Sequence, residues 1–470
     1  MKWLVPFVIC AAFLSCSTDK QTQKSKFYAN VAESVITPPV GTFIIEPRGE
    51  ISSGIHDDLY VRALALGDGE DIYAIVSFDL IGFDDSLVSR IRKAIFDSSG
   101  ITAEQLMLSC SHAHNTPITL DAMDPYPDGL YKNVNKRDTV WENKMIAVTA
   151  STVKSAVNNM KEVYLAQGKH PVQIGYNRRL SLSHRATMSP NPHGPAMKET
   201  DVVFINDEES EMAVLYSYPA HPVSVHSTST EFSADFPGYT ARYIQSRFPG
   251  IVPIFLQGCA GNINSTLKGG YEAAELDGNK LGDAVINSSL SAKAVPPSRI
   301  VYGQHNFHLP YRELEIKTTE LIAKRIEESF RTMRDSNPDF QLSTLQKDLV
   351  NWSQKLRQHA ANNEKGLLSQ AQAIALGKSL AIIAFPDELF VEYALYIKEH
   401  SPFEQTIVLA YTNGSSSYIP TAEALFLGGY EPGYAQVVYG QPFLTPECDR
   451  IIKEESIELL NELWENYETH

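Results

Sequence analysis

Short apolar runs that end in polar loops recur along the chain, and they predict buried strands with reactive side chains at their ends. In the first case, Gln105–Leu108 leads into Ser109–Pro117, a loop that carries His112 and His114. The later cases are Met212–Tyr216 before His221, Val252–Leu256 before Gln257–Asn262, Leu380–Phe385 before Glu388, and Ile407–Ala410 before Tyr411–Gly414 and Tyr418. Open α/β sheets bind ligands at the carboxyl ends of their strands, so these loops are expected to converge on one crevice.

Apolar residues at helical spacing predict helices between and beyond these strands. The predicted helices are Asp85–Ser98, Thr139–Met160, Pro237–Arg247 (opened by Asp235), Glu272–Ser288, Asp387–Glu399 and Pro446–Tyr467. Further strands are predicted at Ser34–Gly41, Asp57–Leu66, Tyr73–Phe78, Val172–Tyr176 and Ile300–His308. The predicted fold class is α/β, with a mixed sheet flanked by helices in a single domain, and the chain has no internal repeat.

Three segments depart from this alternation. Lys317–Glu364 is strongly helical and polar-faced, which indicates a helical insertion into the domain. Ser181–Pro195 is rich in His, Ser and Pro and is predicted to be a loop bordering a cleft. Tyr411–Tyr439 is rich in Tyr and Gly, which is typical either of a mobile loop beside the pocket or of turns between helices.

The amino terminus has the pattern of a targeting segment. After Lys2, the apolar stretch Trp3–Leu14 has the length of a signal-peptide core and is too short for a membrane span. Phe13–Cys16 resembles a bacterial lipoprotein box, with cleavage before Cys16 and acylation of its thiol, and a plain secretory signal is the alternative. We therefore expect a signal peptide with lipobox at residues 1–16, a flexible tether at 17–30 and the domain at 31–470, lipid-anchored in a bacterial cell envelope.

Net charge and cysteine content exclude several classes of protein. The formal net charge of −16 argues against nucleic acid or anionic headgroups as partners, because both require local positive charge. Cys110, Cys259 and Cys448 lie in the predicted domain at spacings that match neither a disulfide framework nor a metal motif. A bridge between Cys110 and Cys259 is one interpretation, and buried thiols are the favoured one. No pattern indicates an oligomeric state.

The polar loops contain a ligand set suited to a metal ion. A catalytic zinc takes three or four nitrogen and oxygen ligands and keeps one position open for water. His112, His221, Glu388 and Tyr418 can supply these ligands from four different loops. A single His in a loop is usually structural, so the argument rests on the shared position after strands. Spacing alone leaves open a metal hydrolase, a metal-free hydrolase and a binding protein.

Several short motifs, in order along the chain, resemble those of the neutral/alkaline, non-lysosomal ceramidases. They are Ser111–Pro117, the His221-Pro222 loop, Pro386–Glu388, Asn177-Arg178 after a predicted strand, and Tyr418–Thr421 followed by Tyr430-Glu431. The last pair, which matches in register, is the most specific. The resemblance implies the catalytic domain of a zinc-dependent hydrolase that cleaves the amide bond of an N-acylated lipid.

The resemblance also implies individual roles. It makes His112, His221, Glu388 and Tyr418 the zinc ligands, and Arg178 and Tyr430 groups that orient the substrate or its oxyanion. His114 is expected to share a strand face with His112 and to move a proton or steady the oxyanion, and a hydrogen-bond partner to a ligand is the alternative. Asp79 and Asp235 are acids that either fix a histidine tautomer or cap a turn.

Two features depart from the family. Where the family has Gly-Asp-Val-Ser-Pro, this chain reads Gly261-Asn262-Ile263-Asn264-Ser265, so Asn264 occupies the position of a proposed nucleophilic serine. A zinc-water mechanism survives this change, and Asn264 becomes either a hydrogen-bond donor to substrate or a turn residue. The characterised enzymes also carry an immunoglobulin-like module after the catalytic domain, and we expect none here.

These departures keep other functions open. A zinc amidase or esterase could act on another N-acyl compound, such as an acylated sugar or a peptidoglycan-derived amide. A surface lipoprotein that binds a lipid or glycan without turnover is the alternative from a different class. Retention of the whole ligand set favours the enzyme, because a binding protein does not need it.

Overall fold

The structure is a computed structural model that describes residues 26–47, 50–120, 137–182, 184–337 and 342–468. The expected signal peptide, the lipobox with Cys16 and most of the expected tether lie outside these residues. Among the described residues, no helix combines the length and the apolar character that crossing a membrane requires.

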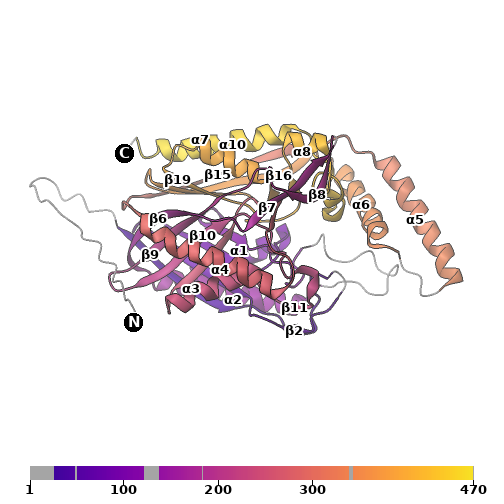
Figure 1. The fold of residues 1–470 in the computed structure, drawn as a ribbon. Coiled ribbons are helices and arrows are strands. Elements are labelled where there is room, and N and C mark those ends of the chain that lie inside the picture. The colour runs from indigo at the N-terminus through magenta and orange to yellow at the C-terminus, as the bar shows by residue number, and fades with distance from the viewer. Residues whose placement is uncertain (1–25, 48–49, 121–136, 183, 338–341, 469–470) are drawn as a thin grey trace, which may run out of the picture.

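Two packed β-sheets form the centre of the molecule, and helices cover their outer faces (Figure 1). The larger sheet has the order β12-β10-β9-β6-β1-β3-β4-β5, with β14 paired to β6. Its strands are β1 Phe27–Val35, β3 Tyr60–Gly67, β4 Ile72–Phe78, β5 Leu106–Cys110, β6 Lys161–Pro171, β9 Glu199–Asn206, β10 Glu211–Tyr218, β12 Val252–Gln257 and β14 Lys293–Val295. The smaller sheet runs β15-β16-β17-β19, with β15 Ile300–Pro310, β16 Gly366–Leu376, β17 Leu380–Ala384 and β19 Gln405–Leu409.

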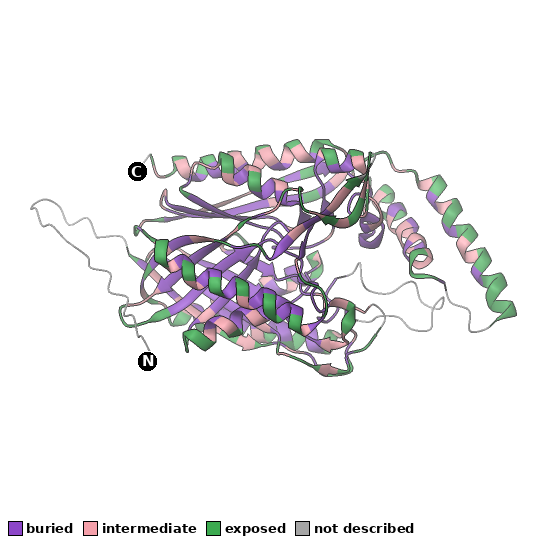
Figure 2. Ribbon diagram, in the orientation of Figure 1, coloured by how far each residue is buried: buried purple, intermediate pink, exposed green. Residues whose placement is uncertain are grey.

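Helices shield each sheet from solvent on one side. Those over the larger sheet are α1 Asp85–Ser99, α2 Thr139–Asn158, α3 Asp235–Arg247 and α4 Tyr271–Asn287, and those over the smaller sheet are α7 Val391–His400 and α10 Glu447–Glu465. Apolar side chains of both sheets form one core cluster between them, which includes Ile75, Leu215 and Ile382. Figure 2 shows both sheets buried and the outer helix faces exposed. The predicted α/β class with a mixed sheet flanked by helices in one domain is confirmed.

The predicted helical insertion consists of α5 Ile316–Ser336 and α6 Thr344–Ala361, which project at one end of the molecule (Figure 1). In α5, Leu321, Ile322 and Met333 are exposed, and it packs mainly on α6. Ser343 begins α6 with a capping box, accepting from the amide of Gln346 while the Gln346 side chain bonds the Ser343 amide.

Several predicted boundaries are wrong. The tether expected at residues 17–30 ends sooner, because Phe27 and Ala29 are fully buried in β1. Of the strand expected at Val172–Tyr176, residues 172–174 form the connection after β6, and Gly175 and Tyr176 begin the next strand. The loop expected at Ser181–Pro195 is largely a hairpin of β7 Gly175–Leu182 and β8 Arg185–Asn191. Strand β8 is mostly exposed, so its sequence lacks the apolar alternation that marks a half-buried strand.

The segment Tyr411–Tyr439 is also more regular than a mobile loop. It contains β20 Tyr418–Ile419, α8 Ala422–Leu427 and α9 Tyr434–Tyr439. Helix α9 is buried almost throughout, so the tyrosines of this segment are packing groups as well as polar ones. The three domain cysteines are free and buried, as favoured from the sequence, and burial raises the pKa of the Cys448 thiol to about 12.

Candidate metal centre

Five strand ends converge on one buried site, and backbone hydrogen bonds join them. The loop after β19 bonds to both edges of the larger sheet, with Cys110 N donating to Tyr411 O at 3.0 Å and Ala410 N donating to Gln257 O at 3.1 Å. The side-chain amide of Gln257 donates to Ser111 O at 2.9 Å and to Ala220 O at 2.8 Å. Tyr411 N also donates to Asp387 O at 3.1 Å, so these contacts together fix the loops of His112, His221 and Glu388 against one another, as expected from their positions after strands.

Each candidate histidine ligand is held in one tautomer by a backbone carbonyl. Nδ1 of His112 lies 2.7 Å from Ile81 O, and Nδ1 of His221 lies 2.8 Å from Ala260 O. A carbonyl only accepts, so Nδ1 donates in both rings and Nε2 is the nitrogen that faces the site. Burial and Arg178 lower the pKa of His221 to about 4, which keeps its ring neutral.

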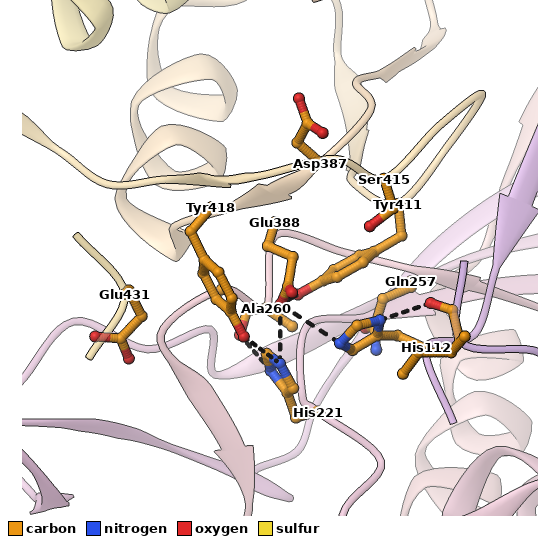
Figure 3. Close-up of polar contacts among 12 residues, drawn as sticks. His112, His221, Gln257, Ala260, Asp387, Glu388, Tyr411, Ser415, Tyr418 and Glu431 are labelled. Atoms are coloured by element: carbon orange, nitrogen blue, oxygen red, sulfur yellow. Dashed lines mark hydrogen bonds and ion pairs between the residues drawn. The ribbon is translucent and has the colours of Figure 1, made fainter. Parts of the chain in front are cut away.

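Glu388 faces both of these nitrogens (Figure 3). Its Oε2 lies 3.1 Å from His221 Nε2 and 3.4 Å from His112 Nε2. Burial raises the pKa of the Glu388 carboxyl, but the two histidines outweigh burial and hold that pKa well below its usual range. Two imidazole Nε2 atoms and one carboxylate oxygen therefore face one another at a single buried point, a set of groups that can bind a cation.

Tyr418 and Arg178 complete one side of the site. Tyr418 OH lies 3.3 Å from His221 Nε2 and accepts from Arg178 Nη2 at 3.1 Å. Burial and Glu388 raise the pKa of Tyr418 well above its usual value, while the Arg178 charge acts in the opposite direction. The Tyr418 phenol is thus neutral when no metal is bound. The Arg178 guanidinium beside it is a positive charge that stabilises the phenolate form.

Arg178 is the most heavily bonded side chain at the site and is only 5% exposed. Its Nε donates to Glu431 Oε1 at 2.9 Å, its Nη1 to Asn264 Oδ1 at 3.0 Å and its Nη2 to Gly261 O at 2.8 Å. Burial disfavours its charge, but Tyr418 and Glu431 hold the pKa of Arg178 well above its ordinary value. Tyr430 packs on this guanidinium, with its ring centroid 5.8 Å from the Arg178 Cζ.

His114 lies beside the cluster, although not on a strand face with His112. Both residues follow the end of β5, and His112 has a left-handed φ of 65°, so period-two alternation does not apply to them. His112, His114 and His221 nevertheless place one ligand nitrogen each within 4.8 Å of one another. Neither ring nitrogen of His114 has a hydrogen-bond partner among the described residues, and burial with the nearby histidines lowers its pKa well below the usual value.

Two solved structures superpose on almost the whole chain. One is a neutral ceramidase from Pseudomonas aeruginosa, with a TM-score of 0.69 and 16% sequence identity, covering 94% of this chain and 75% of that one. The other is a ceramidase complexed with C2, with a TM-score of 0.69 and 15% identity, covering 94% and 76%. The chain has the fold of a neutral ceramidase. No protein-family model and no curated protein matches the sequence.

The neutral ceramidase fold confirms the resemblance seen in the motifs, and it accounts for the convergence of loops that are far apart in sequence. At such low identity the likeness establishes the fold, while the assignment of each side chain rests on the geometry above. That geometry brings together His112, His114, His221, Glu388, Tyr418, Arg178, Tyr430 and Asn264.

Sequence reasoning missed two tyrosines that bond the central carboxylate of the site. Tyr439 OH donates to Glu388 Oε1 at 2.7 Å, and Tyr411 OH donates to Glu388 Oε2 at 3.2 Å. Both residues fall within the segment read as a Tyr-rich loop, and nothing in their spacing distinguishes them from its other tyrosines. They orient Glu388 in the way that partners of a metal ligand usually do.

Asp79 and Asp235 do not fix a histidine tautomer, because backbone carbonyls do so instead. Asp79 Oδ2 accepts from Arg62 Nη1 and from the amide of Tyr60, both at 2.9 Å. Asp235 accepts from the amides of Val225 and Phe236 at the start of α3. Both acids are therefore structural, which was the other interpretation of each.

Asp235 is expected to make stability depend on pH. Burial raises its pKa from 3.8 to about 6, so the folded state binds the proton more tightly than the unfolded state. Its contribution is fully present below pH 3.8 and is lost as the pH rises through about 6, a change of about 3 kcal/mol for about two pK units. Urea denaturation of the wild type and of Asp235→Asn should show the wild type losing about that much relative stability between pH 4 and 7. Parallel curves would contradict this assignment.

Proposed function

We propose that this chain is a zinc-dependent hydrolase that cleaves the amide bond of an N-acylated, ceramidase-like substrate. The observation that carries the proposal is the buried cluster in which His112 Nε2, His221 Nε2 and Glu388 Oε2 face one another, with the two nitrogens 3.4 and 3.1 Å from the carboxylate oxygen. The neutral ceramidase fold around this cluster supports the same reaction class.

The donor set fits zinc. Two imidazole nitrogens, one carboxylate and one phenol make up a ligand set of nitrogen and oxygen atoms, and each histidine is oriented through its other nitrogen. His112, His221, Glu388 and Tyr418 would hold the ion. When bound, zinc polarises an amide carbonyl and lowers the pKa of a bound water to about 7.

Arg178, Asn264 and Tyr430 are proposed to bind the amide as its carbonyl oxygen gains negative charge. The Arg178 guanidinium is fixed before the substrate arrives, because Glu431, Asn264 and Gly261 all bond it. Preorganised donors of this kind stabilise an oxyanion without reorganising during the reaction. The carboxamide oxygen of Asn264 is occupied by Arg178, so its amide nitrogen is left to donate to the substrate.

His114 is proposed to handle the proton. Its lowered pKa keeps the ring neutral, so it can accept a proton at one nitrogen and release it to the leaving amine. The absence of a hydrogen-bond partner within the described residues leaves both nitrogens available for this purpose.

A serine mechanism has less support. Ser265 is fully buried in the short strand β13 Ile263–Ser265, and its Oγ is 3.4 Å from the backbone oxygen of Leu267. Among the described residues, the pair that would activate it, a histidine bonded to its hydroxyl, is not found. We also propose that the lipobox anchors the enzyme through Cys16 in a bacterial cell envelope, where lipid amides are within reach.

The test combines metal content with turnover. Purified protein should contain about one tightly held zinc by elemental analysis and should hydrolyse N-acylsphingosine or another N-acyl amide in a substrate panel. His221→Ala should lose both the metal and the activity, while Ser265→Ala, which keeps the backbone bond from Ser265 N to His221 O and removes only a hydroxyl, should retain both. No metal after reconstitution would contradict the proposal, as would loss of turnover in Ser265→Ala with zinc still bound.

A further inference from the structure

A second group of metal-binding side chains adjoins the first. Glu46, His114 and His226 place one ligand atom each within 4.8 Å of one another. His114 belongs to both groups, and its ring lies 5.5 Å from that of His226 and 5.0 Å from that of His112, centroid to centroid. The two groups are therefore adjacent, and His114 is the residue common to both.

One buried side chain fixes the geometry of the second group. Asn115, which follows His114, is fully buried, and its amide nitrogen donates to Glu46 O at 3.3 Å, to His226 O at 2.9 Å and to Ser229 O at 2.9 Å. The Asn115 amide thus joins the segment of His114 to those of Glu46 and His226, which lie 69 and 111 residues away from Asn115 in the chain. Such preorganisation lowers the entropic cost of binding an ion.

The individual side chains are in suitable states. Nδ1 of His226 is bonded to Ser227 Oγ at 3.0 Å, so Nε2 is the nitrogen that can bind a metal ion. Burial and the charge of Lys268 lower the pKa of His226, so its ring is neutral. His226 is partly exposed, which gives an ion a route from solvent. Two imidazoles and a carboxylate are the donor set that zinc accepts, with a position left for water.

We propose that Glu46, His114 and His226 form a second site for a zinc-type divalent cation, next to the first, in which the proposed proton-handling group His114 serves as a ligand. This site is weaker than the first, because it offers three side-chain ligands and has the positive charge of Lys268 beside it. A cation held there occupies His114.

Zinc titration of metal-free protein, followed by calorimetry, tests the second site directly. The wild type should bind two zinc ions, the second at least about tenfold more weakly. His226→Ala and Glu46→Gln should each bind only the first. The matched control His308→Ala, which removes an exposed histidine from β15, should still bind two. Saturation of the wild type at one ion, or two ions in both His226→Ala and Glu46→Gln, would overturn the inference.

Failure of this inference can be distinguished from failure of the proposed function. His112→Ala should lose the tight ion and keep the weak one, so the two sites report separately. The functional consequence rests on the proposed function: excess zinc should inhibit wild-type amide hydrolysis by occupying His114, and His226→Ala should be at least about tenfold less sensitive. Equal sensitivity of the wild type and His226→Ala would overturn the assignment of inhibition to this site.

Discussion

Replacement of Glu388 by glutamine should abolish both metal binding and amide hydrolysis while leaving the protein folded. The carboxylate is the one negative charge among the proposed ligands, and both histidine Nε2 atoms face it. Loss of a group that merely orients a ligand weakens metal binding about 10–100-fold, so loss of the ligand charge itself should cost at least about 100-fold. Loss of the preorganised charge should lower kcat by about 1000-fold or more.

Tyr439→Phe is the matched control for Glu388→Gln. It keeps the carboxylate and removes the donor 2.7 Å from Oε1, so metal binding should weaken by about tenfold and turnover should persist. Zinc content by elemental analysis and kcat/KM on the best N-acyl substrate measure both effects, and near-ultraviolet circular dichroism checks the fold. Full activity of Glu388→Gln with zinc bound would show that the carboxylate is not a ligand.

Replacement of Arg178 by methionine should destabilise the whole site. The change leaves the buried Glu431 carboxylate with Arg179 alone, and it leaves Asn264 Oδ1 and Gly261 O without their donor. Breaking a buried ion pair by removing one partner costs about 3–5 kcal/mol, because the other charge stays buried. Chemical denaturation should detect this loss, and kcat should fall in protein that remains folded, since the proposed oxyanion donor is gone.

Arg450→Met is the matched control for Arg178→Met. Arg450 pairs with Glu454 on the surface of α10, and its side chain is 63% exposed. An exposed pair of this kind contributes less than about 1 kcal/mol, so the free energy of unfolding should barely change. Equal losses in the two variants would show that burial of the Arg178 network adds no stability.

The sequence predicted which residues gather at the site better than it predicted the structure around them. His112, His221 and Glu388 stand directly after buried strands, and strand ends are recognisable because burial leaves a local apolar run. Helices α3 and α4 were predicted within two residues for a similar reason, since their apolar faces have the helical period. Hairpin β7–β8 escaped prediction because an exposed strand has no such period.

Other features depended on tertiary structure alone. Tyr411 and Tyr439 become partners of Glu388 only when α9 and the loop after β19 pack beside β18 Glu388–Leu389. The direction of three side chains at the site depends on a left-handed backbone conformation at His112, Asp387 and Tyr411. A positive φ at a residue other than glycine or asparagine cannot be predicted from a sequence pattern. Such conformations persist because the surrounding packing imposes them.

What the sequence by itself determined is therefore which residues are candidates for the site and which strands carry them, because both are encoded in local composition and period. Only the tertiary structure decided that Asn115 would tie Glu46 and His226 to His114, and that two sheets would close around the cluster. The physical reason is that contacts between segments 69 and 111 residues apart are set by the packing of whole layers, which leaves no trace in the order of neighbouring residues.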